Sequence, residues 1–268
     1  MSNQQKAYLK AMGIDVWVER LPSASEVTNL SAEQVSTITQ RVTPVIETQV
    51  VSATPVSTES VDITKETIPE PQTTINVDTL DWQALYSLVC ECENCDLSKN
   101  RTKTLFGAGN QTASLMIIGD APNENDEQQA TPYTGEAGQL LTAMLKAMGY
   151  QRNDVYISTL VKCRTAENQD PSVEDVAACE PYLLRQIKLL QPDLILALGV
   201  VAAQRLLKSK STLGRLRGQL HYIDGINVPV IVSFDPAYLL RSPNEKRKAW
   251  EDLQMAMKRL AEVGGVNV

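Results

Sequence analysis

Short, nearly continuous apolar runs recur through the second part of the chain and predict the strands of a buried sheet. Such runs are typical of strands that are covered on both faces of a parallel sheet. The four runs are Ser114–Gly119, Val155–Leu160, Asp193–Leu198 and Val228–Ser233.

Apolar positions at helical spacing lie between these runs and predict helices that cover the sheet. The expected helices span about residues 82–89, 136–149, 173–190, 200–207 and 244–263. Alternation of strands and helices predicts an α/β fold, a three-layer α/β/α sandwich with a four-stranded parallel sheet. Ligands of such sheets bind at the carboxyl ends of the strands, where Asp120, Thr159, Gly199 and Asp235 fall.

The N-terminal third lacks this pattern. Residues 21–80 contain no aromatic residue and no glycine but nineteen Ser or Thr residues, which predicts a disordered acidic linker. A few weak strands, favoured by the Val and Thr content, are the alternative. Residues 1–20 form a short apolar peptide that either binds a partner or folds back on its own domain. We therefore expect three parts: 1–20, 21–80 and 81–268.

Charge and hydropathy narrow the classes of protein only slightly. The net charge is −7, but residues 21–80 carry −6 and residues 1–20 carry +1, which leaves −2 for the remainder. Acidity therefore does not exclude nucleic acid as a partner. The chain has no run of eighteen apolar residues and a polar start, which argues against a membrane span or a secretory signal and predicts a cytoplasmic protein.

Four of the five cysteines form a pattern that predicts a metal centre. Cys92 and Cys95 make a C-x-x-C pair, and Cys163 and Cys179 follow far downstream. Four thiolates suit zinc or an iron–sulfur cluster, and the presence of only one tight pair favours the cluster. The alternative is that Cys163 and Cys179 are ordinary buried thiols. Cys90 leaves open which of Cys90 and Cys92 is the ligand.

Several residues beyond the cysteines are candidates for chemistry, each with a structural alternative. Asp120 follows a strand and could orient a water molecule, or it could cap the next turn. Tyr133 could stack on a flat ligand or pack on the sheet. Leu239, Leu240 and Arg241 could form a wedge that enters a DNA duplex, or the start of a helix on the core.

Together these residues resemble the family-four uracil-DNA glycosylases, the iron–sulfur type. The resemblance covers about residues 88–260, and its motifs are collinear. They are Cys92-x-x-Cys95-x-Leu97, Asp120-Ala121-Pro122, Pro132-Tyr133-Thr134-Gly135, Val161-Lys162-Cys163-Arg164, Cys179-Glu180-Pro181-Tyr182 and Asp235-Pro236-Ala237-Tyr238-Leu239-Leu240-Arg241. The resemblance implies the glycosylase fold and a 4Fe-4S cluster on Cys92, Cys95, Cys163 and Cys179.

The departures from that family fall on its chemistry. Asp120 stands for a glutamate, Tyr133 for the stacking phenylalanine, Thr159 for the uracil-reading asparagine and Asp235 for the catalytic histidine. A carboxylate at Asp235 opposes the negative charge on a departing uracil, and loss of one stabilising donor typically costs about a hundred- to a thousandfold in rate. These departures predict a degenerate pocket without confident catalytic residues, although a protonated Asp235 would still donate a hydrogen bond.

The first twenty residues carry a second resemblance, to the psi subunit of bacterial DNA polymerase III. The residues that match the pattern of that subunit are Leu9, Met12, Ile14, Trp17 and Arg20. The resemblance implies a non-catalytic psi-like subunit of the larger type, which bridges the clamp loader (gamma/tau, delta and delta prime) to chi during DNA replication. This is our first interpretation. The alternative is an atypical uracil-DNA glycosylase of base excision repair, and a third is an inactive DNA-binding or redox-sensing module.

Overall fold

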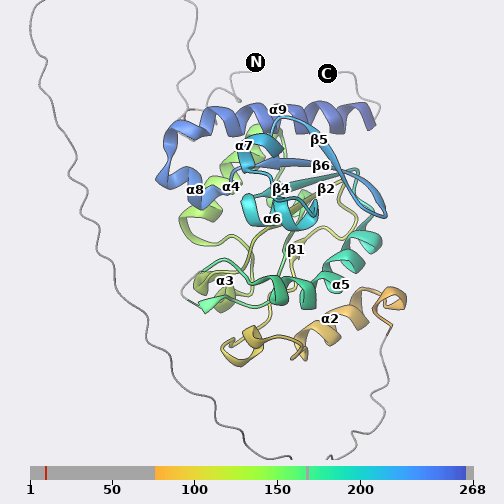
Figure 1. Ribbon diagram of the computed structural model, residues 1–268. Coiled ribbons are helices and arrows are strands. Elements are labelled where there is room, and N and C mark those ends of the chain that lie inside the picture. The colour runs from red at the N-terminus through yellow and green to blue at the C-terminus, as the bar shows by residue number, and fades with distance from the viewer. Residues whose placement is uncertain (1–9, 11–75, 167–168, 264–268) are drawn as a thin grey trace, which may run out of the picture. The chain divides into compact units, whose positions relative to one another are not determined.

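The computed structural model describes residue 10, residues 76–166 and residues 169–263 (Figure 1). The expected N-terminal peptide, with Leu9, Met12, Ile14, Trp17 and Arg20, lies outside the described residues, as do residues 21–75 of the expected linker. Residues 76–80 are described, and they contact the following domain. Lys188 forms an ion pair with Asp78 at 2.6 Å, and Arg185 donates a hydrogen bond to the Leu80 carbonyl at 2.6 Å. Residues 76–80, which were expected to belong to the linker, therefore pack against the domain in the described part of the chain.

A six-stranded sheet forms the centre of the domain, in the order β1-β3-β2-β4-β6-β5. The strands are β1 (Ala108–Gly109), β2 (Leu115–Gly119), β3 (Tyr156–Thr159), β4 (Leu194–Leu198), β5 (Leu220–Ile223) and β6 (Ile226–Ser233). The four strands predicted from the apolar runs pair in parallel as β3-β2-β4-β6, and every residue of β2, β3 and β4 is buried. The antiparallel edge strands β1 and β5 were not predicted. Because β1 has only two residues and the polar His221 interrupts β5, neither forms a continuous apolar run.

Helices cover both faces of the sheet, which confirms the predicted three-layer α/β/α sandwich (Figure 1). The longer helices are α2 (Trp82–Cys90), α4 (Gly135–Met148), α5 (Val173–Leu190) and α9 (Lys246–Val263). The shorter helices are α3 (Glu124–Gln129), α6 (Val200–Leu206), α7 (Leu213–Leu216) and α8 (Pro236–Arg241), and the 3-10 turns are η1 (Val77–Thr79), η2 (Asp96–Lys99), η3 (Arg152–Asp154) and η5 (Pro243–Glu245).

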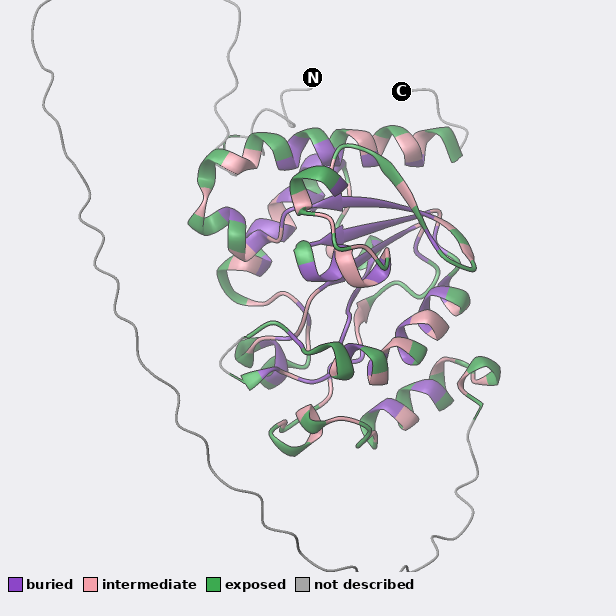
Figure 2. Ribbon diagram, viewed as in Figure 1, coloured by how far each residue is buried: buried purple, intermediate pink, exposed green. Residues whose placement is uncertain are grey.

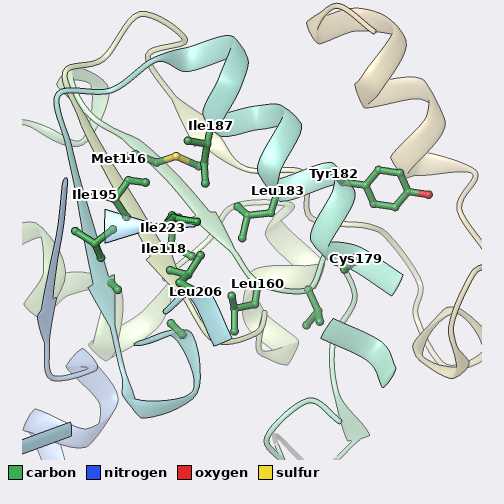
Figure 3. Packing of buried hydrophobic residues seen from close by; sticks show 14 of the residues in the cluster. Met116, Ile118, Leu160, Cys179, Tyr182, Leu183, Ile187, Ile195, Leu206 and Ile223 are labelled. Atoms are coloured by element: carbon green, nitrogen blue, oxygen red, sulfur yellow. The ribbon is translucent and has the colours of Figure 1, made fainter. Parts of the chain in front are cut away.

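Alternate residues of each of the four parallel strands pack into two separate cores, one on either face of the sheet. Met116 and Ile118 of β2 pack with α2, α5 and α6, whereas Leu115 and Ile117 pack with α4, α8 and α9. Figure 3 shows the first core, where Leu183 and other α5 side chains meet the sheet. In Figure 2 the central strands of the sheet are buried, the β5–β6 hairpin is largely exposed or intermediate, and the helices keep exposed outer faces. Among the described residues, no helix combines the length and apolarity that crossing a bilayer requires.

Helix α5 begins and ends at the predicted residues because its boundary signals are local. Ser172 caps the helix by accepting a hydrogen bond from the Asp175 backbone N–H at 3.0 Å. The Asp175 carboxylate in turn accepts from the Ser172 backbone N–H, which completes a capping box. Cys179 lies within this helix, and the helix packs against α2. The position of α5 therefore fixes where the Cys179 thiol lies.

Candidate active site and cysteine site

A cavity of about 740 Å³ opens at the carboxyl ends of the parallel strands and brings together the predicted pocket residues. Asp120, Tyr133, Thr159 and Asp235 all line it. The chain continues from β2 to β3 on one side and then crosses to β4 on the other. The cavity therefore lies at a topological switch point, the usual ligand site of an open parallel sheet.

Asp120 follows β2 directly, and its carboxylate lies against the start of α6. Its Oδ1 accepts a hydrogen bond from the backbone N–H of Ala202 at 2.5 Å. Gly199 makes this approach possible, because a Cβ at that position would lie 2.7 Å from Asp120 Oδ2. Burial, reinforced by the charges of Asp235 and Asp170, raises the pKa of Asp120 to about 7. A carboxyl group that exchanges its proton near neutral pH suits a general base.

Tyr133 and Asp235 form a hydrogen-bonded pair inside the cavity. The Tyr133 hydroxyl donates to Asp235 Oδ2 at 3.0 Å, and Asp235 Oδ1 caps α8 by accepting from the Ala237 N–H at 2.8 Å. Burial raises the pKa of Asp235, although both hydrogen bonds oppose that effect. The Tyr133 ring lies directly on the last residue of β2, where only the absence of a side chain at Gly119 leaves room for it.

Thr159, the last residue of β3, uses its hydroxyl proton within the protein. The hydroxyl donates to the Val161 carbonyl at 2.7 Å, and the residue is buried. Thr159 can therefore accept a hydrogen bond from a ligand but has no proton left to donate. The paired donor and acceptor of an amide are absent at this position.

Helix α8 separates the three residues of the predicted wedge. Leu239 is buried in the core, so the expectation that it contacts DNA is wrong: it faces the sheet one helical turn after Asp235. Leu240 is 38% exposed, and Arg241 is exposed and lines the cavity. Tyr238, which precedes them, stacks on Phe234 with ring centroids 5.5 Å apart and an interplanar angle of 9°.

The four patterned cysteines converge from three parts of the chain. Cys92 and Cys95 lie before and at the start of η2, Cys163 follows β3, and Cys179 lies within α5. The charges of Cys92 and Cys95 act on Cys163, and those of Cys163 and Cys95 act on Cys179. Cys90 is exposed and its thiol interacts with Tyr86. The structure thus groups Cys92, and not Cys90, with the other three.

Polar groups of the protein point at the sulfur atoms. Arg101 donates to Cys163 Sγ at 3.1 Å, and the Tyr182 hydroxyl donates to Cys92 Sγ at 3.3 Å. The backbone N–H of Lys162 donates to Cys179 Sγ at 3.4 Å. Figure 3 shows Cys179 and Tyr182 projecting from α5. Burial raises the pKa of the Cys179 thiol to about 11, so metal ligation must displace its proton.

Four cysteine thiols with hydrogen-bond donors directed at three of them are a donor set that suits an iron–sulfur cluster. Within the described residues, no group of three or more Cys, His, Asp or Glu side chains is arranged to hold one metal ion. An iron–sulfur cubane binds each thiolate through a different iron atom, so its ligands stand farther apart than those of zinc. Hydrogen bonds to the sulfurs are also the usual environment of such clusters.

Two features of the site escaped prediction. Lys162 is only 1% exposed, and its ammonium group donates to Ser158 Oγ at 2.6 Å, the Thr159 carbonyl at 2.9 Å and Gln186 Oε1 at 2.8 Å. The sequence feature that could have predicted this buried network is Lys162 itself, a charged residue at the end of an apolar run. Asp170 also lines the cavity, from a loop whose position no sequence pattern indicates.

Comparison with known proteins identifies the family. Residues 106–254 match the family model described as the Uracil DNA glycosylase superfamily. A type-4 uracil-DNA glycosylase of Pyrobaculum aerophilum is 37% identical over 66% of this chain and 93% of its own length. Proteins of the same name from Thermotoga maritima and Archaeoglobus fulgidus are 37% and 34% identical, over 93% and 90% of their lengths.

These findings overturn our first interpretation, the psi-like adaptor. The matching family and relatives are glycosylases by name, and the match covers the folded domain that the adaptor interpretation treated as a vacated scaffold. The expected partners, the clamp-loader subunits and chi, lose their basis with it. That interpretation rested on a dozen N-terminal residues, and short matches of this length arise without common function. The chain belongs to the uracil-DNA glycosylase superfamily.

Proposed function

We propose that this protein is an atypical uracil-DNA glycosylase, a base excision repair enzyme that hydrolyses the bond between a base and its deoxyribose. The observation that carries the proposal is the Asp120 carboxylate, held in a cavity at the switch point of the sheet. Its pKa of about 7 leaves a large ionised fraction at neutral pH. The names of the relatives, type-4 uracil-DNA glycosylases, support the same reaction.

The reaction needs a base flipped out of the DNA and into the cavity. Asp120 orients a water molecule and takes its proton while the water oxygen attacks C1′ of the deoxyribose. The C1′–N1 bond breaks, and its electron pair leaves with uracil. An ionised Asp235 opposes that negative charge, so we expect uracil release to be slower than with a neutral or cationic group there, by on the order of a hundred- to a thousandfold.

Leu240 and Arg241 are the proposed DNA contacts. Both are exposed at the end of α8, beside the cavity that would receive the base. An apolar side chain can occupy the space that a flipped nucleotide leaves, and an arginine can hold the neighbouring phosphate. Tyr133 also lines the cavity, and its ring is the candidate to stack on the base.

Cys92, Cys95, Cys163 and Cys179 would hold a 4Fe-4S cluster. The convergence of their sulfurs and the donors pointed at them support this assignment. Such a cluster, when bound, supplies cross-links between distant segments, and it can also carry an electron. The protein's own contribution is to place Arg101 and Tyr182 against the sulfurs and to join the segment before η2 to α5.

Base release from a duplex with a single uracil tests the proposal. We expect strand-cleavable abasic sites to accumulate with the wild-type chain, and Asp120→Ala to lose at least a hundredfold in rate. Asp154→Ala, which removes an exposed carboxylate outside the cavity, is the matched control. Equal rates for wild type and Asp120→Ala would reject Asp120 as the base.

A further inference from the structure

Several polar groups in the cavity lining can act toward a ligand only as hydrogen-bond acceptors. Three of its side-chain hydroxyls donate their only proton inside the protein: Tyr133 to Asp235, Thr159 to the Val161 carbonyl and Thr165 to the Gln169 carbonyl. Each of these oxygens offers only lone pairs to a ligand. Uracil presents two carbonyl acceptors on either side of a single N3–H donor, so its carbonyls find no partner among these three hydroxyls.

Negative charge dominates the same lining. Its described residues include four aspartates (Asp120, Asp126, Asp170, Asp235), and Arg241 is the one basic residue among them. The Asp126 carboxylate already has partners within the protein, because its Oδ1 accepts hydrogen bonds from the backbone N–H and the hydroxyl of Thr134, both at 2.6 Å. The other three carboxylates act on one another: the charges of Asp235 and Asp170 both disfavour ionisation of Asp120. A cation in the cavity would relieve this repulsion.

Aromatic faces add a third feature that favours a flat cation. Phe234 and Tyr238 stack on each other and both line the cavity. The Arg217 guanidinium lies over the Phe234 ring, 5.5 Å from its centroid, so the rings that remain for a ligand are Tyr238 and Tyr133, the latter in the turn before α4. Aromatic faces attract planar cations through the negative charge of the ring centre. The cavity volume of about 740 Å³ leaves room for a two-ring base.

Resting on the proposed N-glycosylase function, we infer that the preferred substrate is a purine made cationic by N-alkylation, such as 7-methylguanine or 3-methyladenine in DNA. The positive charge distinguishes this lesion from every normal base, and the amino groups of such purines donate hydrogen bonds to acceptors. Asp235, which is unfavourable for uracil release, becomes favourable for this substrate.

The reaction balances without any further reagent. The water oxygen attacks C1′, Asp120 takes the water proton, and the C1′–N9 bond breaks. The electron pair of that bond moves to N9 and neutralises the purine ring. Because the leaving group is neutral, Asp235 does not oppose its departure. The carboxylates instead stabilise the positive charge that grows on the sugar in the transition state.

A competition between two bases tests the inference. Duplex DNA that carries methylated purines and a duplex with a single uracil are incubated with the full chain, and released bases are quantified by chromatography against Asp120→Ala, which measures spontaneous loss. We expect methylpurine release to be at least tenfold faster than uracil release. Uracil release as fast as methylpurine release, or faster, would overturn the inference and leave the proposed function intact. Release of neither base would overturn both.

Asp235→Asn gives the sharper test because its effects should have opposite signs. The amide keeps the cap on α8 but removes the charge. We expect methylpurine release to fall by about tenfold or more and uracil release to rise severalfold. Parallel changes for the two bases would contradict the electrostatic assignment. Should Asp235→Asn fail to fold, Asp170→Asn removes another negative charge from the cavity lining at an exposed position. Asp224→Asn, which removes an exposed charge outside the cavity, is the control.

Discussion

A single carboxyl group, Asp120, links the stability of this protein to pH in an unusual direction. Burial raises its pKa from 3.8 to about 7, so the folded chain holds this proton more tightly than the unfolded chain. The stabilisation is complete below the unfolded pKa near 4 and is lost as the pH rises through about 7. Each tenfold change in proton affinity is worth about 1.4 kcal/mol, which gives roughly 4 kcal/mol for the whole range.

We therefore predict that Asp120→Asn is more resistant to urea than wild type at about pH 8, while the two proteins unfold nearly alike at about pH 3.5. Replacing this carboxyl group changes the free energy of unfolding little where the group is neutral in both the folded and the unfolded chain. Urea titrations at the two pH values measure the difference in the free energy of unfolding. A difference of equal size at both values would show that the ionisation of Asp120 is not its cause.

Among the elements, the buried strands and capped helices could be predicted, and the contacts between distant loops could not. Helix α5 was predicted at its observed bounds because its cap lies within four residues of sequence. Strand β5 was missed because it is short and His221 interrupts its apolar residues. The Tyr133–Asp235 hydrogen bond joins residues 102 positions apart, and only the parallel order of β2, β4 and β6 brings them together.

Gly199, in the turn from β4 into α6, has a backbone conformation that favours glycine and leaves room for the Asp120 carboxylate. Its φ is +105°, and an added Cβ would lie 2.7 Å from the Asp120 carboxylate. Gly149 has a similar φ of +91°, but nothing lies within 4 Å of a Cβ added there. We expect Gly199→Ala and Gly149→Ala each to lose about 1–3 kcal/mol of stability through backbone strain. Only Gly199→Ala should also lose about a hundredfold in base release, since it displaces the carboxylate that we propose as the base.

Thermal unfolding and base-release rates, measured on both variants, separate the two effects. Comparable losses of activity in both would mean that strain alone, transmitted through the fold, explains the defect. Retained activity in Gly199→Ala would show that Asp120 tolerates displacement and would weaken its assignment as the base.

The whole domain is built as two cores on one sheet, and the cysteines lie beside only one of them. Cys179 belongs to the core of α2, α5 and α6, whereas α4 and α9 pack on the opposite face. Losing the proposed cluster should therefore loosen one layer and spare the other.

We predict that Cys163→Ala purifies without iron, whereas Cys90→Ala keeps its full iron content, because Cys90 stands apart from the four converging sulfurs. Hydrogen exchange should rise in residues 91–101 of Cys163→Ala and stay low in α4 and α9, since neither helix touches the cysteine site. Iron loss in Cys90→Ala would replace Cys92 by Cys90 in the ligand set, and equal exchange in both layers would show that the cysteine site supports the entire sheet.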